Sequence, residues 1–244
     1  QFFVQNIGPK IAPYAHGLNT KLMNCKYLKD LDSAYYSIYL RDIKNAIDLY
    51  REENISLFTE LTNKAQKFGE ISAQMTVQID GKDQTLQQAS VHLKSIDRDK
   101  RKAVFELINA RRAEDQTSLD ILLDELIAKR QELARNTNFE NFRDYKFQAM
   151  GRFDYTKEDC FDFHTSIEKE IVPLIADIHK ERKMLLGLEV LKPWDMQVDP
   201  NGNEPLKPFD GGEDLLDKCI ACFDQIRPYY GDCIRQMKAM GHLD

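Results

Sequence analysis

The stretch from Lys82 to Met150 contains neither glycine nor proline, and this feature constrains the fold more than any other. Glycine and proline are the residues that most often end or kink a helix. Apolar residues recur along the stretch at the spacing of one helical face. They are Val104, Leu107, Ile108, Leu119, Leu122, Leu123, Leu126 and Leu133. The pattern predicts two long helices with a break near residues 112–117, where charged and polar residues interrupt the apolar face.

Helical periodicity also covers most of the chain before this stretch. Helices are expected over residues 9–24, where Pro9 suits a first helical position, and over residues 32–52. Asn54 is a plausible N-cap of a third helix, which Gly69 is expected to end or weaken.

A short segment after the third helix departs from the helical pattern. Val77 and Ile79 alternate with polar residues and lead into Asp80-Gly81, a dipeptide that supplies the positive φ angles of a type I′ turn. The segment therefore predicts a β-hairpin. A capping box formed by Thr85 and Gln88 is expected to start the next helix.

The last third of the chain contains a helix, a loop and two more helices. Thr156 and Asp159 resemble a second capping pattern, and Pro173 should kink the helix that they open. Residues 191–212 hold four of the eight prolines and three glycines, which predicts an extended loop. Helices are expected at about 213–226 and 229–240.

These patterns predict an all-α fold, mostly α with one short β-hairpin, built as a multi-helical bundle of long helices. The expected division of the chain is a helical N-terminal part (1–75), the hairpin (76–86), long helices (87–190), the Pro/Gly-rich loop (191–212) and the final helices (213–244). Because the chain starts with Gln1 and its last residues read as a helix stop followed by a new segment, we expect both ends to be cut.

Composition disfavours several classes of partner. The net charge is −6, and no cluster of Lys and Arg is long enough to form a phosphate-binding stripe, so a nucleic-acid partner is not expected. No apolar stretch approaches the ~18 residues that a membrane span needs. The five cysteines are an odd number without a signal peptide, which favours reduced thiols and a cytoplasmic location.

The histidines do not form the commonest helical zinc motif, which places two histidines four residues apart with a glutamate after the first. No histidine here precedes a glutamate, and no two are four residues apart. They are interpreted as surface or boundary side chains and are His16, His92, His164, His179 and His242.

Two other segments could hold a metal, but each has a more ordinary interpretation. Cys219 and Cys222 have zinc-knuckle spacing, and Cys233 with His242 would complete a set of four ligands, yet the first two belong to an apolar helical stripe. Residues 199–210 superficially resemble a calcium loop but have Glu204 where the loop needs glycine.

Paired acids on the helices, Glu168/Glu170 and Asp214/Asp217, are typical of exposed helix faces and single out no site. No catalytic or metal-binding residue is therefore expected in this chain, and the residue pattern leaves the substrate-binding residues unknown.

Several segments together resemble the oligoendopeptidase F branch of the thimet-like zinc metallopeptidases, peptidase family M3. The hairpin segment 76–86 is followed by 95–101, Ser-Ile-Asp-Arg-Asp-Lys-Arg, which is similar to a short Asp-Arg-x-x-Arg stretch of that family. Segment 134–145 is similar to its aromatic Gly-Phe-x-Asn-Tyr-x-x-Tyr run, with Asn138 and Phe142 in place of Gly and Tyr.

The resemblance continues to the end of the chain in the same order. Lys192-Pro-Trp-Asp195 resembles the Trp-Asp element before the family's long loop, and residues 228–244 resemble the passage that leads into its active-site half. In that family a His-Glu-x-x-His helix and a further glutamate ligand follow. This sequence contains none of these residues, so the resemblance transfers no catalytic or metal position to it.

The resemblance implies a fold that is part of a bowl- or clam-shaped, mostly helical peptidase whose channel admits short peptides. This segment would be a non-catalytic wall of the channel, inactive alone, in a zinc metalloendopeptidase whose catalytic residues lie outside it. Its apolar helix faces would then be covered by the missing catalytic half or another chain. The expected contributors are Phe223, Ile226, Tyr229, Tyr230 and Met237. The alternative is a stand-alone helical module that binds a peptide or protein without enzymatic activity.

Overall fold

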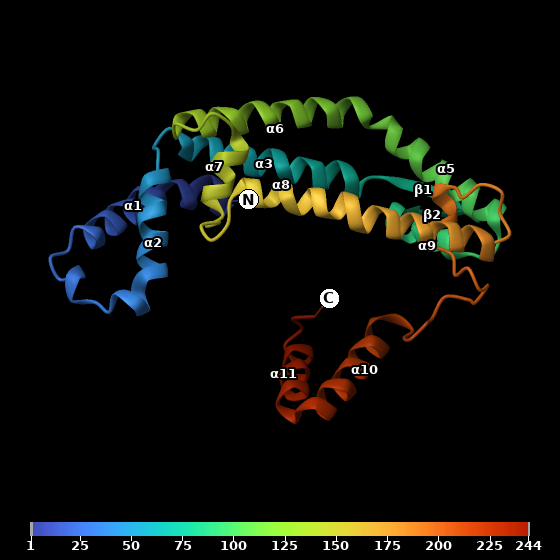
Figure 1. The fold of residues 1–244 in the computed structure, drawn as a ribbon. Coiled ribbons are helices and arrows are strands. Elements are labelled where there is room, and N and C mark those ends of the chain that lie inside the picture. Colours follow the sequence, from blue (N-terminus) through green and yellow to red (C-terminus); the bar gives the residue numbers. More distant parts are fainter. Residues whose placement is uncertain (1, 244) are drawn as a thin grey trace.

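The computed structural model describes residues 2–243, and Asp244, the last residue of the expected final segment, lies outside them. The helices are α1 (Gly8–Met23), α2 (Ser33–Leu49), α3 (Asn54–Ala73), α4 (Leu86–Ser90), α5 (Arg98–Glu114), α6 (Gln116–Asn136), α7 (Phe142–Ala149), α8 (Lys157–Ser166), α9 (Val172–Leu185), α10 (Gly211–Ile226) and α11 (Pro228–Ala239). They form an arched layer from α1 to α9, and α10 and α11 lie beneath its open side (Figure 1). The all-α prediction is confirmed.

The predicted hairpin is also confirmed. Strands β1 (Thr76–Ile79) and β2 (Lys82–Thr85) pair antiparallel around Asp80 and Gly81, and both turn residues have positive φ. Thr85 then forms the expected capping box with Gln88, which starts α4. Within residues 2–243 these two strands are the only sheet.

The long stretch without glycine or proline folds as predicted at its centre. α5 ends at Glu114 and α6 begins at Gln116, so the break lies inside the expected range. The same stretch also contains the short helices α4 and α7, which the periodicity did not separate from the long ones. Asn138, which stands where the family resemblance has glycine, adopts a φ of 64° just after α6. Asparagine tolerates this left-handed conformation better than most residues.

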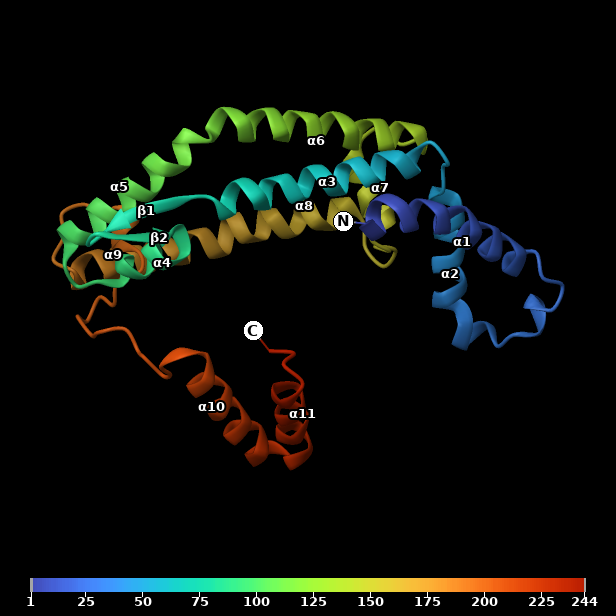
Figure 2. The same cartoon turned by 180° about the vertical axis from the view of Figure 1, so that it is seen from behind.

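The hydrophobic core consists of two clusters at opposite ends of the arch (Figure 1). At one end, the hairpin, α4 and the helical turn Val91–Lys94 pack against α5. This cluster contains Val77, Ile79, Ala89, Leu93, Val104 and Ile108. At the other end, α3, α6 and α7 meet around Leu57, Leu133, Ala134 and Tyr145. Together these clusters fix the curvature of the layer, because α3 and α6 run side by side between them (Figure 2).

The structure corrects two expectations about α3, the N-cap at Asn54 and a helix end at Gly69. Asn54 is the first residue of the helix but does not cap it; its buried side chain donates to the Leu133 carbonyl at 3.2 Å and accepts from Asn136 at 2.7 Å, both on α6. The Asn54 side chain therefore makes a tertiary contact instead of a local capping hydrogen bond. Gly69 does not end the helix, which continues to Ala73, because a glycine inside a helix costs only ~1 kcal/mol.

α8 and α9 form one long run joined by a π-helical turn, Ile167–Ile171. Pro173 follows this turn and has no N–H to continue the regular helical hydrogen bonds. A kink is expected at this proline, and the structure has a π turn just before it. None of the residues of this run is buried.

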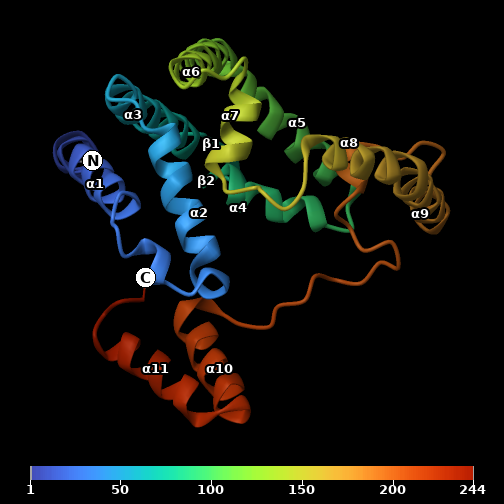
Figure 3. The same ribbon diagram turned by 60° about the vertical axis from the view of Figure 1, so that its left-hand side comes forward.

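The hairpin of α10 and α11 lies apart from the arched layer (Figures 1 and 2), although it overlaps the end of α2 in the view of Figure 3. The two helices pack mainly against each other, and the segment between the turn Pro193–Asp195 and α10 joins them to the layer. At Gly231 the helices approach so closely that a Cβ there would overlap the Asp224 carboxylate. The predicted loop and the two final helices are thus present.

Candidate functional site

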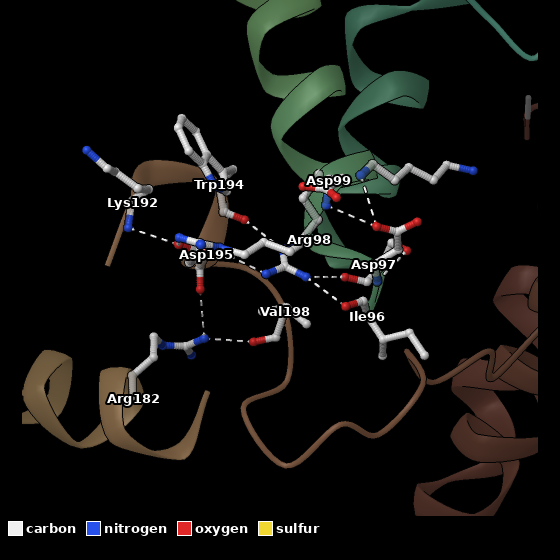
Figure 4. A network of polar contacts seen from close by, with 12 residues as sticks. Ile96, Asp97, Arg98, Asp99, Arg182, Lys192, Trp194, Asp195 and Val198 are labelled. Atoms are coloured by element: carbon white, nitrogen blue, oxygen red, sulfur yellow. Dashed lines mark hydrogen bonds and ion pairs between the residues drawn. The ribbon is translucent and has the colours of Figure 1, made fainter. Parts of the chain in front are cut away.

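The Asp195 carboxylate, at the end of the turn Pro193–Asp195, accepts four hydrogen bonds. It accepts two hydrogen bonds from Arg98, through Nε at 3.0 Å and Nη2 at 2.9 Å, and one from Arg101 Nη2 at 2.9 Å. The backbone N–H of Lys192 donates a fourth at 3.0 Å. Figure 4 shows Arg98 of α5 and the backbone of Lys192 directed toward the Asp195 carboxylate.

A second layer of contacts holds the turn itself. Arg101 also donates through Nε to the Trp194 carbonyl at 3.0 Å, and Arg182 of α9 donates to the carbonyls of Asp195 at 3.3 Å and Val198 at 2.7 Å. Arginine suits this role because its planar guanidinium carries five donors in a fixed geometry. The junction therefore fastens α5, the turn and α9 together.

The protonation of Asp195 follows from these contacts. Burial of the carboxyl acts to raise its pKa, but the hydrogen bonds from Arg98, Arg101 and the Lys192 N–H outweigh burial and lower the pKa below its ordinary value. The side chains of Asp195 and Arg101 are 0% and 3% exposed. A charged carboxylate with four donors and no contact with solvent is held in place, and we interpret it as a structural joint rather than as a reactive group.

The sequence contains both halves of this junction but does not reveal that they meet. Arg98 and Arg101 come from the Asp-Arg-x-x-Arg stretch, and Asp195 from the Trp-Asp element, two of the segments on which the family resemblance is based. Their spacing of three residues places both arginines on one face of α5. The sequence features that indicate the pairing are the three-residue spacing of the arginines and the distant Trp194-Asp195 dipeptide.

The structure keeps the sequence-predicted metal candidates apart. Among residues 2–243, no group of three or more His, Cys, Asp or Glu side chains is arranged to hold a metal ion. Cys219, Cys222, Cys233 and His242 thus do not form a four-ligand set, and all the cysteines are free thiols.

The individual histidines have other surroundings. His16 stacks on Tyr50 with ring centroids 3.9 Å apart, and His92 lies 3.2 Å from the side-chain oxygen of Gln84. His164 and His242 are exposed, and His179 is half-buried. Because no group of possible ligands surrounds any of them, these contacts agree with the interpretation of the histidines as surface or boundary residues.

The loop that superficially resembles a calcium site forms a polar turn. The Asp199 carboxylate accepts hydrogen bonds from the Asn201 backbone at 2.9 Å and the Asn203 amide at 2.8 Å. These donors, the Asn201 N–H first, lower the pKa of Asp199 below its ordinary value. An oxygen ligand set for calcium would need these carboxylate lone pairs, and they already bind protein donors.

The paired acids lie on solvated helix faces. Glu168 and Glu170 are exposed in the π turn, while Asp214 binds Lys218 at 2.7 Å and Asp217 binds Lys238 at 3.0 Å. None of these acids lies in a cleft or faces another acid at close range, so they provide no arrangement for acid and base catalysis.

The arch leaves large apolar faces in contact with solvent. The five side chains singled out on α10 and α11 are all exposed in this chain: Phe223 40%, Ile226 68%, Tyr229 63%, Tyr230 43% and Met237 42%. The α8–α9 run exposes a second stripe. Its members are Ile171, Leu174, Ile175 and Ile178.

The total surface of the chain is correspondingly large. Its accessible area is 17731 Å², whereas a compact monomer of 28.4 kDa exposes about 11,200 Å². The excess of about 6,500 Å² is far above the ~800 Å² per partner that a standard protein interface buries. A surface of this size is typical of a chain that folds against a large partner surface.

Several cavities lie on the arch, among them two of similar volume. The first, of about 280 Å³, is an apolar groove between α1 and α3, lined among others by Phe3, Pro9, Ile55 and Phe58. The second, also of about 280 Å³, lies at the end of α7 and mixes charged and aromatic side chains: Asp144, Phe147, Gln148, Arg152, Phe153 and Lys157. No helix of residues 2–243 is both long and apolar enough to cross a membrane.

Comparison with known proteins decides the family. The sequence model of peptidase family M3 matches residues 91–211, a range that contains both arginines and the aspartate of the junction. The chain belongs to peptidase family M3. None of the curated proteins matches it.

Solved structures share the fold of this M3 chain. A crystal structure described as an oligoendopeptidase F from Bacillus anthracis strain Ames matches with a TM-score of 0.86 at 21% identity. A structure of PZ peptidase A with an inhibitor matches with a TM-score of 0.88 at 22% identity. The matches cover 97% and 98% of this chain but 43% and 42% of those structures. The chain thus spans less than half the length of the M3 peptidases that it resembles.

Proposed function

We propose that this chain forms a non-catalytic wall of the substrate channel in a zinc metallo-oligopeptidase that hydrolyses short peptides. One observation carries the proposal. The chain matches the peptidase structures over nearly its whole length but covers less than half of each of them, and it exposes 17731 Å² of surface. Exposed apolar faces of this extent are typical of surfaces that pack against another protein segment.

The wall would act by exclusion. The long helices α3 and α6 pack side by side between two core clusters, and the Asp195 junction fastens α5 and α9 to each other. Rigid helices of this kind keep folded proteins away from a recessed site and admit extended peptides. The chain's own residues would bind and confine the peptide.

Zinc is part of the proposal for the parent enzyme, and the residues of this chain do not fit it. The histidines are dispersed, the cysteines lie outside any ligand group, and the Asp199 carboxylate already accepts protein hydrogen bonds. Residues outside this chain would have to hold the metal, so we derive no catalytic step from the residues present here. Cytoplasmic location and short peptides as substrates remain predictions.

The test begins with the coding sequence beyond the codon for Asp244. We expect it to encode a His-Glu-x-x-His helix and a later glutamate ligand. The extended protein should cleave a quenched-fluorescent pentapeptide but should not cleave a folded protein that contains the same five residues. The 244-residue chain should cleave neither substrate. Peptide cleavage by the 244-residue chain, or an extended protein without the zinc motif, contradicts the proposal.

The alternative is a helical module that binds a peptide or protein without catalysis. The exposed stripes on α8–α9 and α10–α11 favour it as well, because they could serve any apolar partner. The two proposals differ in the gene: an extended reading frame without zinc ligands, together with a stable complex of the isolated chain, supports the binding module.

A further inference from the structure

The cavity at the end of α7 is held open by contacts with α2. Asn45 and Gln148 form two hydrogen bonds with each other. The Asn45 side-chain amide donates to the backbone carbonyl of Gln148 at 3.1 Å, and the Gln148 side-chain amide donates to Asn45 Oδ1 at 2.9 Å. Arg41 lies over the Phe153 ring at 4.6 Å. These contacts fix both the floor of the cavity and the loop, residues 150–156, that forms its rim.

The charges around this cavity do not cancel. Arg143, Asn141 and Lys157 surround the Asp144 carboxylate, and the hydrogen bond from Arg143 at 2.9 Å is the main reason that the pKa of Asp144 falls to about 2. Arg152 lies over the Phe147 ring at 5.5 Å. Within residues 2–243, no carboxylate lies within ion-pair distance of Arg152, which leaves its positive charge uncompensated.

The position of the cavity relates it to the proposed channel. The loop after α7 lies on the side of the arch that faces the α10–α11 hairpin (Figures 1 and 3). In a wall that confines peptides, this is the side along which a peptide would lie.

We propose that this cavity receives the C-terminal carboxylate of a short peptide. Arg152 would form the ion pair with the carboxylate, and the rings of Phe147 and Phe153 would contact the last side chain of the peptide. This inference rests on the proposed function. It adds a substrate class, peptides with a free C-terminus.

The size of the cavity supports a terminal residue as its occupant. Pockets for drug-sized ligands have volumes of about 300–1,000 Å³, and this cavity of about 280 Å³ lies just below that range. A cavity of this volume has space for one terminal residue. A guanidinium binds a carboxylate in a planar geometry with two parallel hydrogen bonds, which favours a terminal carboxylate over a backbone carbonyl.

The experiment uses the isotope-labelled 244-residue chain and three acetylated pentapeptides ending in phenylalanine. The first has a free C-terminal carboxylate, the second a C-terminal amide, and the third a C-terminal amide with a glutamate beside it. NMR titration follows the Arg152 Nε–H signal and the ring signals of Phe147 and Phe153. Arg152→Gln is compared with Arg152→Lys and with Arg112→Gln, which makes the same change at an exposed arginine on α5 without an ion-pair partner.

We expect the free carboxylate peptide to bind roughly tenfold more tightly than its amide, with shifts at Arg152. Arg152→Gln should abolish this preference, Arg152→Lys should keep part of it, and Arg112→Gln should keep all of it. Equal binding of acid and amide overturns the carboxylate site but leaves the channel wall in place. Equal binding of the glutamate peptide and the free acid overturns the assignment to a chain end. Binding of none of the peptides overturns the site and counts against the channel wall.

Discussion

Asp195 and Arg101 form a buried ion pair at 2.9 Å although 94 positions separate them in the chain. The pair joins the first turns of α5 to the element that precedes the long loop. Arg101 uses its other donors on the carbonyls of Ser95, Ile96 and Trp194. Every charged group of the pair is thus neutralised or hydrogen-bonded, which is the condition under which a buried charge is tolerated.

Replacing Asp195 by asparagine should destabilise the arch strongly. The amide keeps the size of the carboxylate but leaves Arg101 buried without a counter-charge, a change that typically costs about 3–5 kcal/mol. Urea unfolding followed by circular dichroism measures the loss. Asp154→Asn is the matched control, because its pair with Arg41 is exposed and should contribute less than about 1 kcal/mol. Equal effects of the two substitutions would contradict a buried joint at Asp195.

Asp144 should make the stability of the chain sensitive to acid. Its pKa in the folded chain is about 2, below the ordinary 3.8, chiefly because Arg143 donates to it. A lowered carboxyl pKa stabilises the fold above the ordinary value, and this contribution is lost as the pH falls from about 4 through about 2.

The test compares the pH dependence of unfolding in variants at both partners. The difference in unfolding free energy between the native chain and Asp144→Asn should be constant above pH ~5 and shrink between pH ~4 and ~2. Arg143→Gln removes the main cause of the lowered Asp144 pKa and should therefore narrow the pH range over which this free-energy difference changes. A difference that stays constant down to pH ~2 would show that the carboxylate gains nothing from its neighbours.

Gly231→Ala should weaken the packing of α11 against α10. The new Cβ would overlap the Asp224 carboxylate, and moving that carboxylate would break its ion pair with Arg235. Overpacking of this kind costs about 1–3 kcal/mol. Hydrogen exchange should accelerate in α10 and α11 and stay unchanged in α3 and α6. Gly212→Ala is the control, since a Cβ at Gly212 meets nothing within 4 Å.

The apolar face of α10 should be dispensable for the stability of the isolated chain. Ile226 is 68% exposed, so Ile226→Ser should change the unfolding free energy by less than about 0.5 kcal/mol and reduce self-association in analytical ultracentrifugation. Ile220 on the same helix is buried, and Ile220→Ser should cost at least about 2 kcal/mol. A large stability loss for Ile226→Ser would mean that Ile226 belongs to the core of this chain.

Local patterns predicted the elements that depend on neighbouring residues. The hairpin at Asp80-Gly81, the capping boxes at Thr85 and Thr156, and the break between α5 and α6 are all determined within a few positions of the chain. The wrong N-cap prediction involves a residue with a distant partner. Asn54 has the chemistry of an N-cap, and only contact with α6 redirected its side chain.

The amino-acid sequence by itself therefore determined the all-α class, the hairpin and the absence of the commonest helical zinc motif, because helix periodicity, turn chemistry and ligand spacing are properties of short segments. Only the tertiary structure decided which apolar stripes become core and which remain exposed. Ile220 and Ile226 are isoleucines of the same helix, α10, yet Ile220 is buried and Ile226 is exposed. The tertiary structure also brought Arg98, Arg101 and Asp195 together, because an ion pair between distant segments depends on the path of the whole chain between them.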